Sequence, residues 1–259
     1  MGNKAKVLIF DIETSPNLAY VWGKWKQNIY SGQFLEKSYI MSFAAKWLDN
    51  DEIIYFDNRH NNDKQLVREL YKLLDEADVV VAHNGKKFDL PRVLGRGLVH
   101  DLMPPSPYHV VDTLLVARRR FGFLSNSLAD LCEELKLPLK GKHKKFAGFD
   151  LWVQCLKQND DAWDEMEEYN KQDILSLEAL YLRLLPYIDT HPNVSRKQGT
   201  DVCQCTNCGS ESFQLRGTYH SKAGLAYQRF VCNDCHSWGR YKLSEKDRGQ
   251  NNMRSASNG

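Results

Sequence analysis

The sequence lacks any long uninterrupted run of apolar residues. No stretch approaches the ~20 apolar residues that a membrane-spanning helix needs. Only four apolar residues separate Lys6 from Asp11, which is too few for the apolar part of a secretory signal peptide. The first residues, MGNKAK, also lack the Ser or Thr that the N-myristoylation pattern requires at its sixth position. We therefore expect a cytoplasmic protein that does not interact with a membrane.

The sequence also lacks an internal repeat and an even distribution of charge. Its 259 residues, 42% of them hydrophobic, can bury one sizeable core and leave a small appendage. Residues 1–190 carry 25 Lys and Arg against 28 Asp and Glu, whereas residues 191–259 carry 10 against 5. The net charge of +2 thus combines an acidic part with a basic one. The basic end indicates a polyanionic partner.

Cysteine is scarce in most of the sequence and concentrated near its end. Of the seven cysteines, Cys132 and Cys155 stand alone among apolar residues, and five lie between residues 203 and 235. In a cytosolic chain such crowding indicates a metal site rather than disulfides. Two C-x2-C pairs, 23 residues apart, have the spacing of a tetrahedral four-thiolate zinc site and comprise Cys205, Cys208, Cys232 and Cys235.

Two neighbouring residues are alternative zinc ligands. Cys203 competes with Cys205, whereas His236 is a weaker candidate because Cys235 already completes the second pair. Residues 212–220 and 225–231 alternate as strands do, so we expect a zinc ribbon. So small a unit has too little core to fold alone, and zinc binding can supply about 10–16 kcal/mol.

Residues 6–190 alternate between strand-like and helix-like segments. Apolar spacing, helix stops and turn residues predict strands at residues 6–11, 39–47, 52–56 and 78–82, and helices at 63–75, 90–97, 128–135 and 161–185. This order predicts an α/β fold with a mixed sheet flanked by helices. We expect a body at residues 1–190, a linker at 191–202, the ribbon at 203–243 and a disordered tail at 244–259.

Four carboxylates stand next to buried segments. Asp11 and Glu13 lie in VLIFDIETSP at the end of the first strand, Asp89 follows another strand in AHNGKKFDLP, and Asp173 lies in YNKQD on the last long helix. Residues two apart in a strand point to the same side, so Asp11 and Glu13 face one point. Carboxylates that converge repel each other unless a multivalent cation lies between them. Hard oxygen ligands suit Mg²⁺ or Mn²⁺, so the sequence predicts a metal there.

Three of these segments, FDIET, HNGKKFD and YNKQD, resemble the three motifs of the RNase H-like 3′–5′ exonuclease superfamily, in the tyrosine subclass of its DEDD type. Proofreading domains of family-B DNA polymerases have similar DIET, Asn-x-x-x-Phe-Asp and Tyr-x-x-x-Asp patterns. The resemblance covers most of residues 6–187, including VDTLLVARRRF and NSLADLCEELKL, and three motifs in order are far more specific than one. YVWGKWKQN, GFDLWVQC and EEYNKQDILSLEALYLRLLP most resemble small stand-alone exonucleases that phages often encode.

The resemblance implies an RNase H-like mixed β-sheet flanked by helices and a site in which Asp11, Glu13, Asp89 and Asp173 bind two Mg²⁺ or Mn²⁺ ions. Such ions lie roughly 3.5–4 Å apart, one activating the attacking water and the other stabilising the leaving 3′ oxygen. Tyr169, one helical turn before Asp173, is implied to orient that water. Positioning is the safer role for Tyr169, because a phenol is a weak acid at neutral pH.

The resemblance also implies substrate contacts. Asn84 and Phe88 match positions that touch the terminal nucleotides in relatives, and Thr14 matches a position that contacts the 3′ end. Structural roles are the alternatives: Asn84 begins an Asn-Gly turn, Tyr169 lies on an amphipathic helix, and His83 is more typical of a packed histidine than of a ligand.

Purely structural roles are also alternatives for each acidic residue taken singly. Asp89 can be an N-cap before the next helix, and Asp11 and Asp173 can be a strand cap and a solvated helix acid, although the four together favour a site. Asp112 resembles a position near the site, but an N-cap before TLLVAR explains it equally well, so we leave it out.

Two basic segments are candidate contacts to phosphates. The loop KLPLKGKHKKF, residues 136–146, includes Lys142 and Lys144, which are expected to neutralise substrate phosphates and make affinity salt-dependent. An ordinary solvated loop is the alternative. In the run from Arg118 to Arg120, neighbouring residues on a helix spread over different faces, so at most two can face nucleic acid.

The ribbon interleaves aromatic and basic side chains, a pattern that suits stacking on bases and pairing with phosphates. A docking or stabilising module is the alternative. The favoured function is a 3′–5′ exonuclease that releases nucleoside 5′-monophosphates from single-stranded or frayed DNA ends. RNA trimming, structure-specific cleavage and non-catalytic nucleic-acid binding stay open. We find no polymerase, helicase or ligase segment, so a polymerase or repair partner would be another chain, in the host cytoplasm if a phage encodes the protein.

Overall fold

The computed structural model describes residues 5–59, 62–138, 145–195, 203–243 and 254–255. A five-stranded sheet with the order β5-β4-β1-β6-β7 forms the centre of the body. β1 pairs antiparallel with β4 and parallel with β6, so the sheet is mixed as predicted. The strands are β1 (Val7–Thr14), β4 (Ile40–Trp47), β5 (Ile53–Asp57), β6 (Val79–Ala82) and β7 (His109–Asp112).

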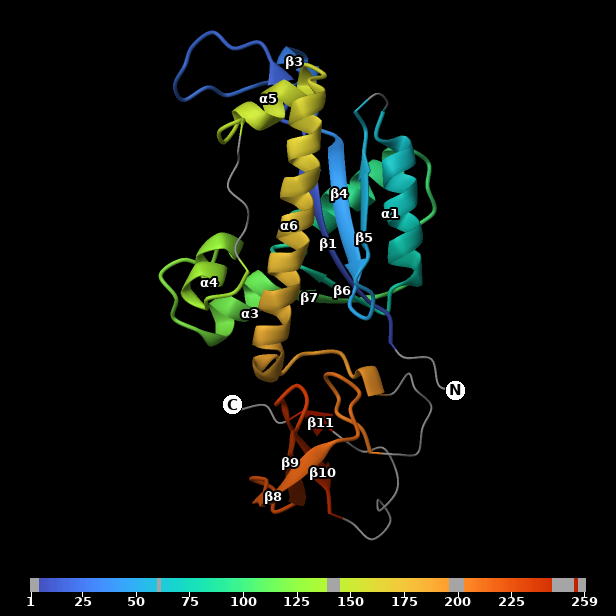
Figure 1. Ribbon diagram of the computed structural model, residues 1–259, viewed down its shortest axis with the longest axis vertical. Coiled ribbons are helices and arrows are strands. Elements are labelled where there is room, and N and C mark those ends of the chain that lie inside the picture. The colour runs from blue at the N-terminus through green and yellow to red at the C-terminus, as the bar shows by residue number, and fades with distance from the viewer. Residues whose placement is uncertain (1–4, 60–61, 139–144, 196–202, 244–253, 256–259) are drawn as a thin grey trace.

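Helices cover both faces of this sheet (Figure 1). One face packs against α1 (Lys64–Glu76) and α2 (Asp89–Val99), and the other against α3 (Thr113–Arg120), α4 (Leu128–Glu134) and α6 (Asp160–Leu184). The short helix α5 (Asp150–Leu156) packs beside the start of α6, and the 3₁₀ turn η2 (Leu185–Tyr187) follows its end. The predicted mixed sheet flanked by helices is confirmed.

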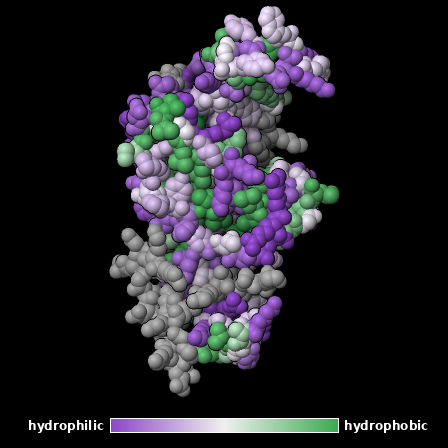
Figure 2. Space-filling model, turned by 180° about the vertical axis from the view of Figure 1, so that it is seen from behind, coloured by the Kyte–Doolittle hydropathy of each residue, from purple (hydrophilic) through white to green (hydrophobic). Residues whose placement is uncertain are grey.

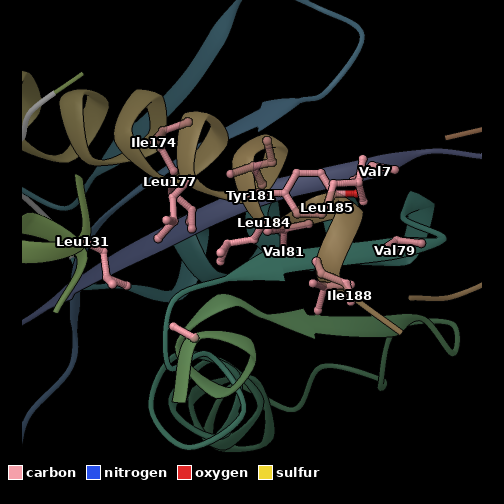
Figure 3. Close-up of a cluster of buried hydrophobic side chains, with 14 of the residues drawn as sticks. Val7, Val79, Val81, Leu131, Ile174, Leu177, Tyr181, Leu184, Leu185 and Ile188 are labelled. Carbon is pink, nitrogen blue, oxygen red and sulfur yellow. The ribbon is translucent and has the colours of Figure 1, made fainter. Parts of the chain in front are cut away.

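The alternation of side chains along the strands explains the two cores. Val7 and Ile9 of β1 point to the α6 side, whereas Leu8 and Phe10 point to the side of α1 and α2. Figure 3 shows the first cluster, in which α6 and β6 contribute Ile174, Leu177, Tyr181, Leu184, Val79 and Val81. Because both faces of β1 are buried, its sequence is a continuous apolar run rather than an alternating one.

The element boundaries differ from the sequence expectation mainly in β1. It extends through Thr14, so Asp11 and Glu13 lie within the strand rather than at its end. β7, α3 and α5 had no specific assignment, because their short segments have weak periodicity. The other predicted elements agree with the structure to within about two residues.

The cysteine-rich segment folds as a small antiparallel sheet of order β11-β10-β9-β8. Its strands are β8 (Phe213–His220), β9 (Ala226–Cys232), β10 (Trp238–Lys242) and β11 (Arg254–Ser255). Thus residues 254–255 of the predicted tail form a strand, and the rest of that tail lies outside the described residues. The division into domains stays a prediction.

This ribbon packs against the end of α6 and η2. The Asn207 side-chain amide donates to the carbonyl oxygens of Leu185 and Ile188 at 3.2 and 3.3 Å, and the Ser237 hydroxyl donates to Leu185 O. Val194 and Ser195, in the predicted linker, are buried, with exposed fractions of 7% and 0%. The first part of that segment therefore belongs to the packed structure.

A loop with β2 (Leu18–Ala19), η1 (Ser31–Gln33) and β3 (Phe34–Glu36) projects from the end of the body opposite the ribbon (Figure 1). The view from behind shows apolar side chains gathered over the middle of the body, with mostly hydrophilic residues at its upper end (Figure 2). Among the described residues, no helix has the length and apolar character needed to cross a bilayer.

Candidate functional site

Three of the four predicted carboxylates meet between β1 and α6. Asp11 and Glu13 point to the α6 side of β1, and Asp173 lies on the buried face of α6. One oxygen from each carboxylate lies within 4.8 Å of the others. Two oxygens bound to one Mg²⁺ ion lie at most about 4.2 Å apart, because each oxygen is about 2.1 Å from the ion. The observed spacing of the oxygens therefore needs at most a small adjustment to hold such an ion.

The pairing of β1 is irregular beside Glu13. The pairing with β4 shifts between Glu13 and Thr14, which pair with Ser42 and Ile40 respectively. A bulge of this kind bends a strand and redirects its side chains, and it is common beside active sites. Glu13 thus lies beside the point where β1 departs from regular pairing, whereas Asp11 pairs regularly with Ala44.

Asp89 approaches the same strand from the first turn of α2. β1 pairs with β6 only through Val7, Leu8 and Ile9, and the N–H of Ile12 instead donates to Asp89 Oδ1 at 3.4 Å. Asp89 is the first residue of α2, and its predicted alternative role as an N-cap is not observed, because Phe88 occupies that position. Asp89 is not in the group of three within 4.8 Å.

Burial makes Asp89 an unusual carboxyl. Its exposed fraction is 2%. Loss of hydration, and secondarily the charge of Asp112, raise the pKa of Asp89 from its ordinary value to about 7, although hydrogen bonds from backbone amides oppose the shift. A buried anion of this kind is stabilised by a nearby cation.

The structure adds Asn170, which sequence reasoning missed. This fully buried residue of α6 donates from Nδ2 to Asp11 Oδ2 at 3.0 Å, and its Oδ1 accepts from the Ser42 hydroxyl at 3.1 Å. Because the Asp11 carboxylate can only accept hydrogen bonds, the Asn170 amide nitrogen faces Asp11 and the amide oxygen accepts from Ser42. The available signal was its position in YNKQD, three residues before Asp173 and so on the same helix face.

The remaining predicted site residues lie on the elements that carry the carboxylates. Tyr169 is half-buried one turn before Asp173, and its ring packs edge-on against Trp152 of α5 at 6.0 Å. The Phe88 ring is covered by the Arg92 guanidinium at 4.4 Å. Thr14 ends β1 beside the bulge. These positions are compatible with substrate contacts but do not test them.

The turn after β6 depends on the left-handed backbone of Asn84 and on the close packing of Gly85 against Ala82. Asn84 has φ 67°, and a Cβ on Gly85 would lie 2.4 Å from Ala82 Cβ. Asp112 accepts from the N–H groups of Asn84 and Lys86 and, as the expected N-cap of α3, from Leu115 N. Asp112 therefore fixes the turn that leads to Asp89.

His83 and the basic segments have mostly structural contacts. The His83 ring hydrogen-bonds with Thr113 Oγ1 and Asn126 O, both at 2.9 Å, which supports the packed role expected for it. Arg119 and Arg120 pair with Asp189, so these two cations are already engaged within the protein. Lys142 and Lys144 lie outside the described residues, and their role stays a prediction.

The second candidate metal centre is in the ribbon. The sulfur atoms of Cys205, Cys208, Cys232 and Cys235 lie within 4.8 Å of one another. The Sγ atoms of Cys205 and Cys235, and those of Cys208 and Cys232, are 3.6 Å apart. Zn–S bonds of about 2.3 Å in a tetrahedron require a separation of about 3.8 Å. The four thiols that the spacing selected therefore fit zinc, and Cys203 is not in this group.

Comparison with known proteins assigns the body to a superfamily. The model of the RNase_H superfamily matches residues 8–185. A family B DNA polymerase from the hyperthermophilic archaeon Pyrobaculum calidifontis has a similar structure, with a TM-score of 0.54 and 14% identity over 88% of this chain. This chain spans 32% of that polymerase, and the low identity supports the fold alone. No curated protein matches the sequence. The match over most of the body confirms the resemblance inferred from the motifs, and the chain belongs to the RNase_H superfamily.

Proposed function

We propose that this protein is a divalent-metal-dependent 3′–5′ exonuclease that hydrolyses DNA and releases nucleoside 5′-monophosphates. The observation that carries the proposal is the convergence of oxygens from Asp11, Glu13 and Asp173 within 4.8 Å, beside the buried carboxyl of Asp89. Membership of the RNase_H superfamily supports nuclease chemistry. The order of the three motifs supports attack at a 3′ end.

The donor set fits two Mg²⁺ or Mn²⁺ ions. All four side chains offer hard oxygen ligands, and the raised pKa of Asp89 indicates a carboxyl that gains from a neighbouring cation. When bound, such ions lower the pKa of a water molecule and stabilise the negative charge on the leaving oxygen. Carboxylates held by β1, α2 and α6 keep their oxygens in place, because these elements are packed in the core.

The surrounding residues orient the reactants. Asn170 holds the Asp11 carboxylate through its hydrogen bond, and Tyr169 orients the attacking water from the same helix. Thr14, Asn84 and Phe88 contact the terminal nucleotides. Asn84 is suited to this because the left-handed turn presents it at the end of β6.

The ribbon binds one structural zinc ion and assists in holding the nucleic acid. Phe213 and Phe230 pack together as its core, with ring centroids 5.1 Å apart. Trp238, in contrast, is 46% exposed and lines a hollow with Arg183 where the ribbon meets the body. An exposed aromatic ring beside a guanidinium group suits a polyanion.

The biological setting follows from the motif resemblance. Because the sequence pattern resembles that of stand-alone phage-type exonucleases, we propose a replication or repair role in the host cytoplasm.

The decisive experiment incubates 5′-labelled DNA and RNA strands with the protein and Mg²⁺ or Mn²⁺. We expect a ladder that shortens from the 3′ end of DNA. Asp11→Ala/Glu13→Ala should abolish it. Asp51→Ala/Glu52→Ala removes an exposed pair of acids outside the site and should leave the ladder unchanged.

Other outcomes distinguish the remaining nuclease and binding functions. Preferential shortening of RNA would indicate RNA trimming, and internal cuts would indicate a structure-specific endonuclease. Intact strands that are shifted on a native gel would show a non-catalytic binding protein and refute the proposal.

A further inference from the structure

The loop that joins β1 to β4 exposes an unusual number of aromatic side chains. We call residues 17–37 the arm. Residues 20–32 are all exposed, and the exposed fractions are 99% for Trp22, 76% for Trp25, 69% for Tyr20 and 73% for Tyr30. Single exposed aromatics are ordinary, but several on one short projecting segment mark an interaction surface.

The base of the arm is firmly attached to the body. Ser15 N donates to Tyr39 O and Ser15 Oγ accepts from Tyr39 N, both at 2.9 Å, and Ser38 N donates to Asn17 Oδ1 at 2.8 Å. Further out, Gln33 Nε2 donates to Tyr20 O. The exposed rings are therefore carried on a braced base rather than on an unsupported loop.

The charge of the arm points to an anionic partner. The arm contains three lysines, Lys24, Lys26 and Lys37, and one acidic residue, Glu36, although the body as a whole has more acids than bases. Lys24 Nζ lies 5.2 Å from the centroid of the Trp25 ring. Flat rings interleaved with cations match the way proteins hold single strands, in which bases stack on the rings and phosphates pair with the cations.

The arm is continuous with the acidic site. It begins three residues after Thr14, the end of the strand that carries Asp11 and Glu13. Figure 1 shows it projecting beside α5 and the start of α6, away from the ribbon. A single-stranded nucleic acid whose end lies among the carboxylates can therefore continue along the arm without crossing the β-sheet.

We propose that the arm binds single-stranded nucleic acid by stacking bases on Trp22 and Trp25 and pairing phosphates with Lys24 and Lys26. The identity of this ligand rests on the proposed nuclease function. The binding itself is measured separately from cleavage, so that failure of one can be told from failure of the other.

The test measures binding of a 5′-fluorescein-labelled oligothymidylate to the full chain by anisotropy, without added Mg²⁺ or Mn²⁺. Trp22→Ala/Trp25→Ala should weaken binding about tenfold or more, because stacking contributes strongly for each base. Trp22→Phe/Trp25→Phe should retain most of the affinity, since phenylalanine also offers a flat ring. Leu124→Ala, which shortens an equally exposed apolar side chain elsewhere, should have no effect.

Two further measurements test the phosphate contacts of the lysines and check that the alanine pair keeps its structure. Lys24→Gln/Lys26→Gln should reduce the slope of log affinity against log salt by about 1.4. The alanine pair should leave hydrolysis of the p-nitrophenyl ester of thymidine 5′-monophosphate unchanged, because this substrate is too small to reach the arm. The KM of the Trp22→Ala/Trp25→Ala variant for a long oligonucleotide should rise.

Equal affinity of the wild type and the tryptophan-to-alanine pair for the oligonucleotide would overturn the proposal. Binding to anionic phospholipid vesicles is measured with the same two proteins. If Trp22→Ala/Trp25→Ala weakens binding to the vesicles but not to the oligonucleotide, the arm is a membrane contact and the proposal is also overturned. If the wild type binds the oligonucleotide but hydrolyses neither substrate, the proposed nuclease function fails and the arm proposal is judged on binding alone.

Discussion

Replacing Asp89 with asparagine should stabilise the metal-free protein at neutral pH and weaken its binding of divalent metal. Asp89 is 2% exposed, and burial raises its pKa from the ordinary 3.8 to about 7. The folded state therefore holds a proton that the unfolded state releases, so the free energy of unfolding falls as pH rises from about 4 to about 7. Asparagine keeps an oxygen that can accept from Ile12 N and removes the ionisation.

The magnitude follows from the size of the shift. A rise from 3.8 to about 7 is about 3 pKa units, and each unit corresponds to about 1.4 kcal/mol. Above pH 7 the charged carboxyl thus lowers the free energy of unfolding by about 4 kcal/mol in the absence of metal. At pH 5 the free energy of unfolding is lowered by only about 2 kcal/mol, because pH 5 lies between the pKa values of the unfolded and folded states and only part of the effect has accumulated.

Urea unfolding followed by circular dichroism measures this effect. Wild type and Asp89→Asn are compared at about pH 5 and pH 8, without added Mg²⁺ or Mn²⁺ and without chelator, so that zinc is kept. The variant should be more stable, with a larger gain at pH 8. Added Mn²⁺ should then stabilise the wild type more than the variant.

Asp51→Asn, an exposed carboxyl outside the site, is the matched control and should not alter the pH dependence. If Asp89→Asn is no more stable than the wild type at pH 8, or gains equally at both pH values, the argument that burial destabilises this carboxylate is wrong.

Three further substitutions test other parts of the structure. Asn170→Ala removes the hydrogen bond to Asp11 and should lower kcat about 10- to 100-fold, as loss of ligand-supporting contacts does in metal sites; unchanged kcat in a Mg²⁺ titration would contradict that role. Cys205→Ser should abolish zinc binding and unfold the ribbon, as zinc content and thermal melting would report, whereas Cys203→Ser should keep both; the reverse pattern would exchange the two ligands. Asp63→Asn weakens the hydrogen bonds that the Arg96 guanidinium of α2 donates to the buried Asp63 carboxylate and should reduce the free energy of unfolding by about 3 kcal/mol; an unchanged urea midpoint would show that these bonds contribute little.

Much of the candidate site was visible in the sequence because its signals are local. The spacing of Asp11 and Glu13 in a strand, and of the cysteines in two C-x2-C pairs, places each pair on one side of a short segment. Asn170 gave no comparable signal, since its partner Asp11 is 159 residues away. The boundary of β1 was missed for a related reason, because its last residues are held by β4 rather than by their own apolar character.

Local patterns of residues encode the periodicity of the strands and helices, the candidate carboxylates and thiols, and the uneven distribution of charge. These features depend on residues a few positions apart. Long-range packing brings Asp173 of α6 to β1, buries Asp89, seats the ribbon on the end of α6 and leaves the tryptophans of the arm exposed. Such features arise from contacts between residues far apart in the chain, and no local pattern encodes which distant segments will meet.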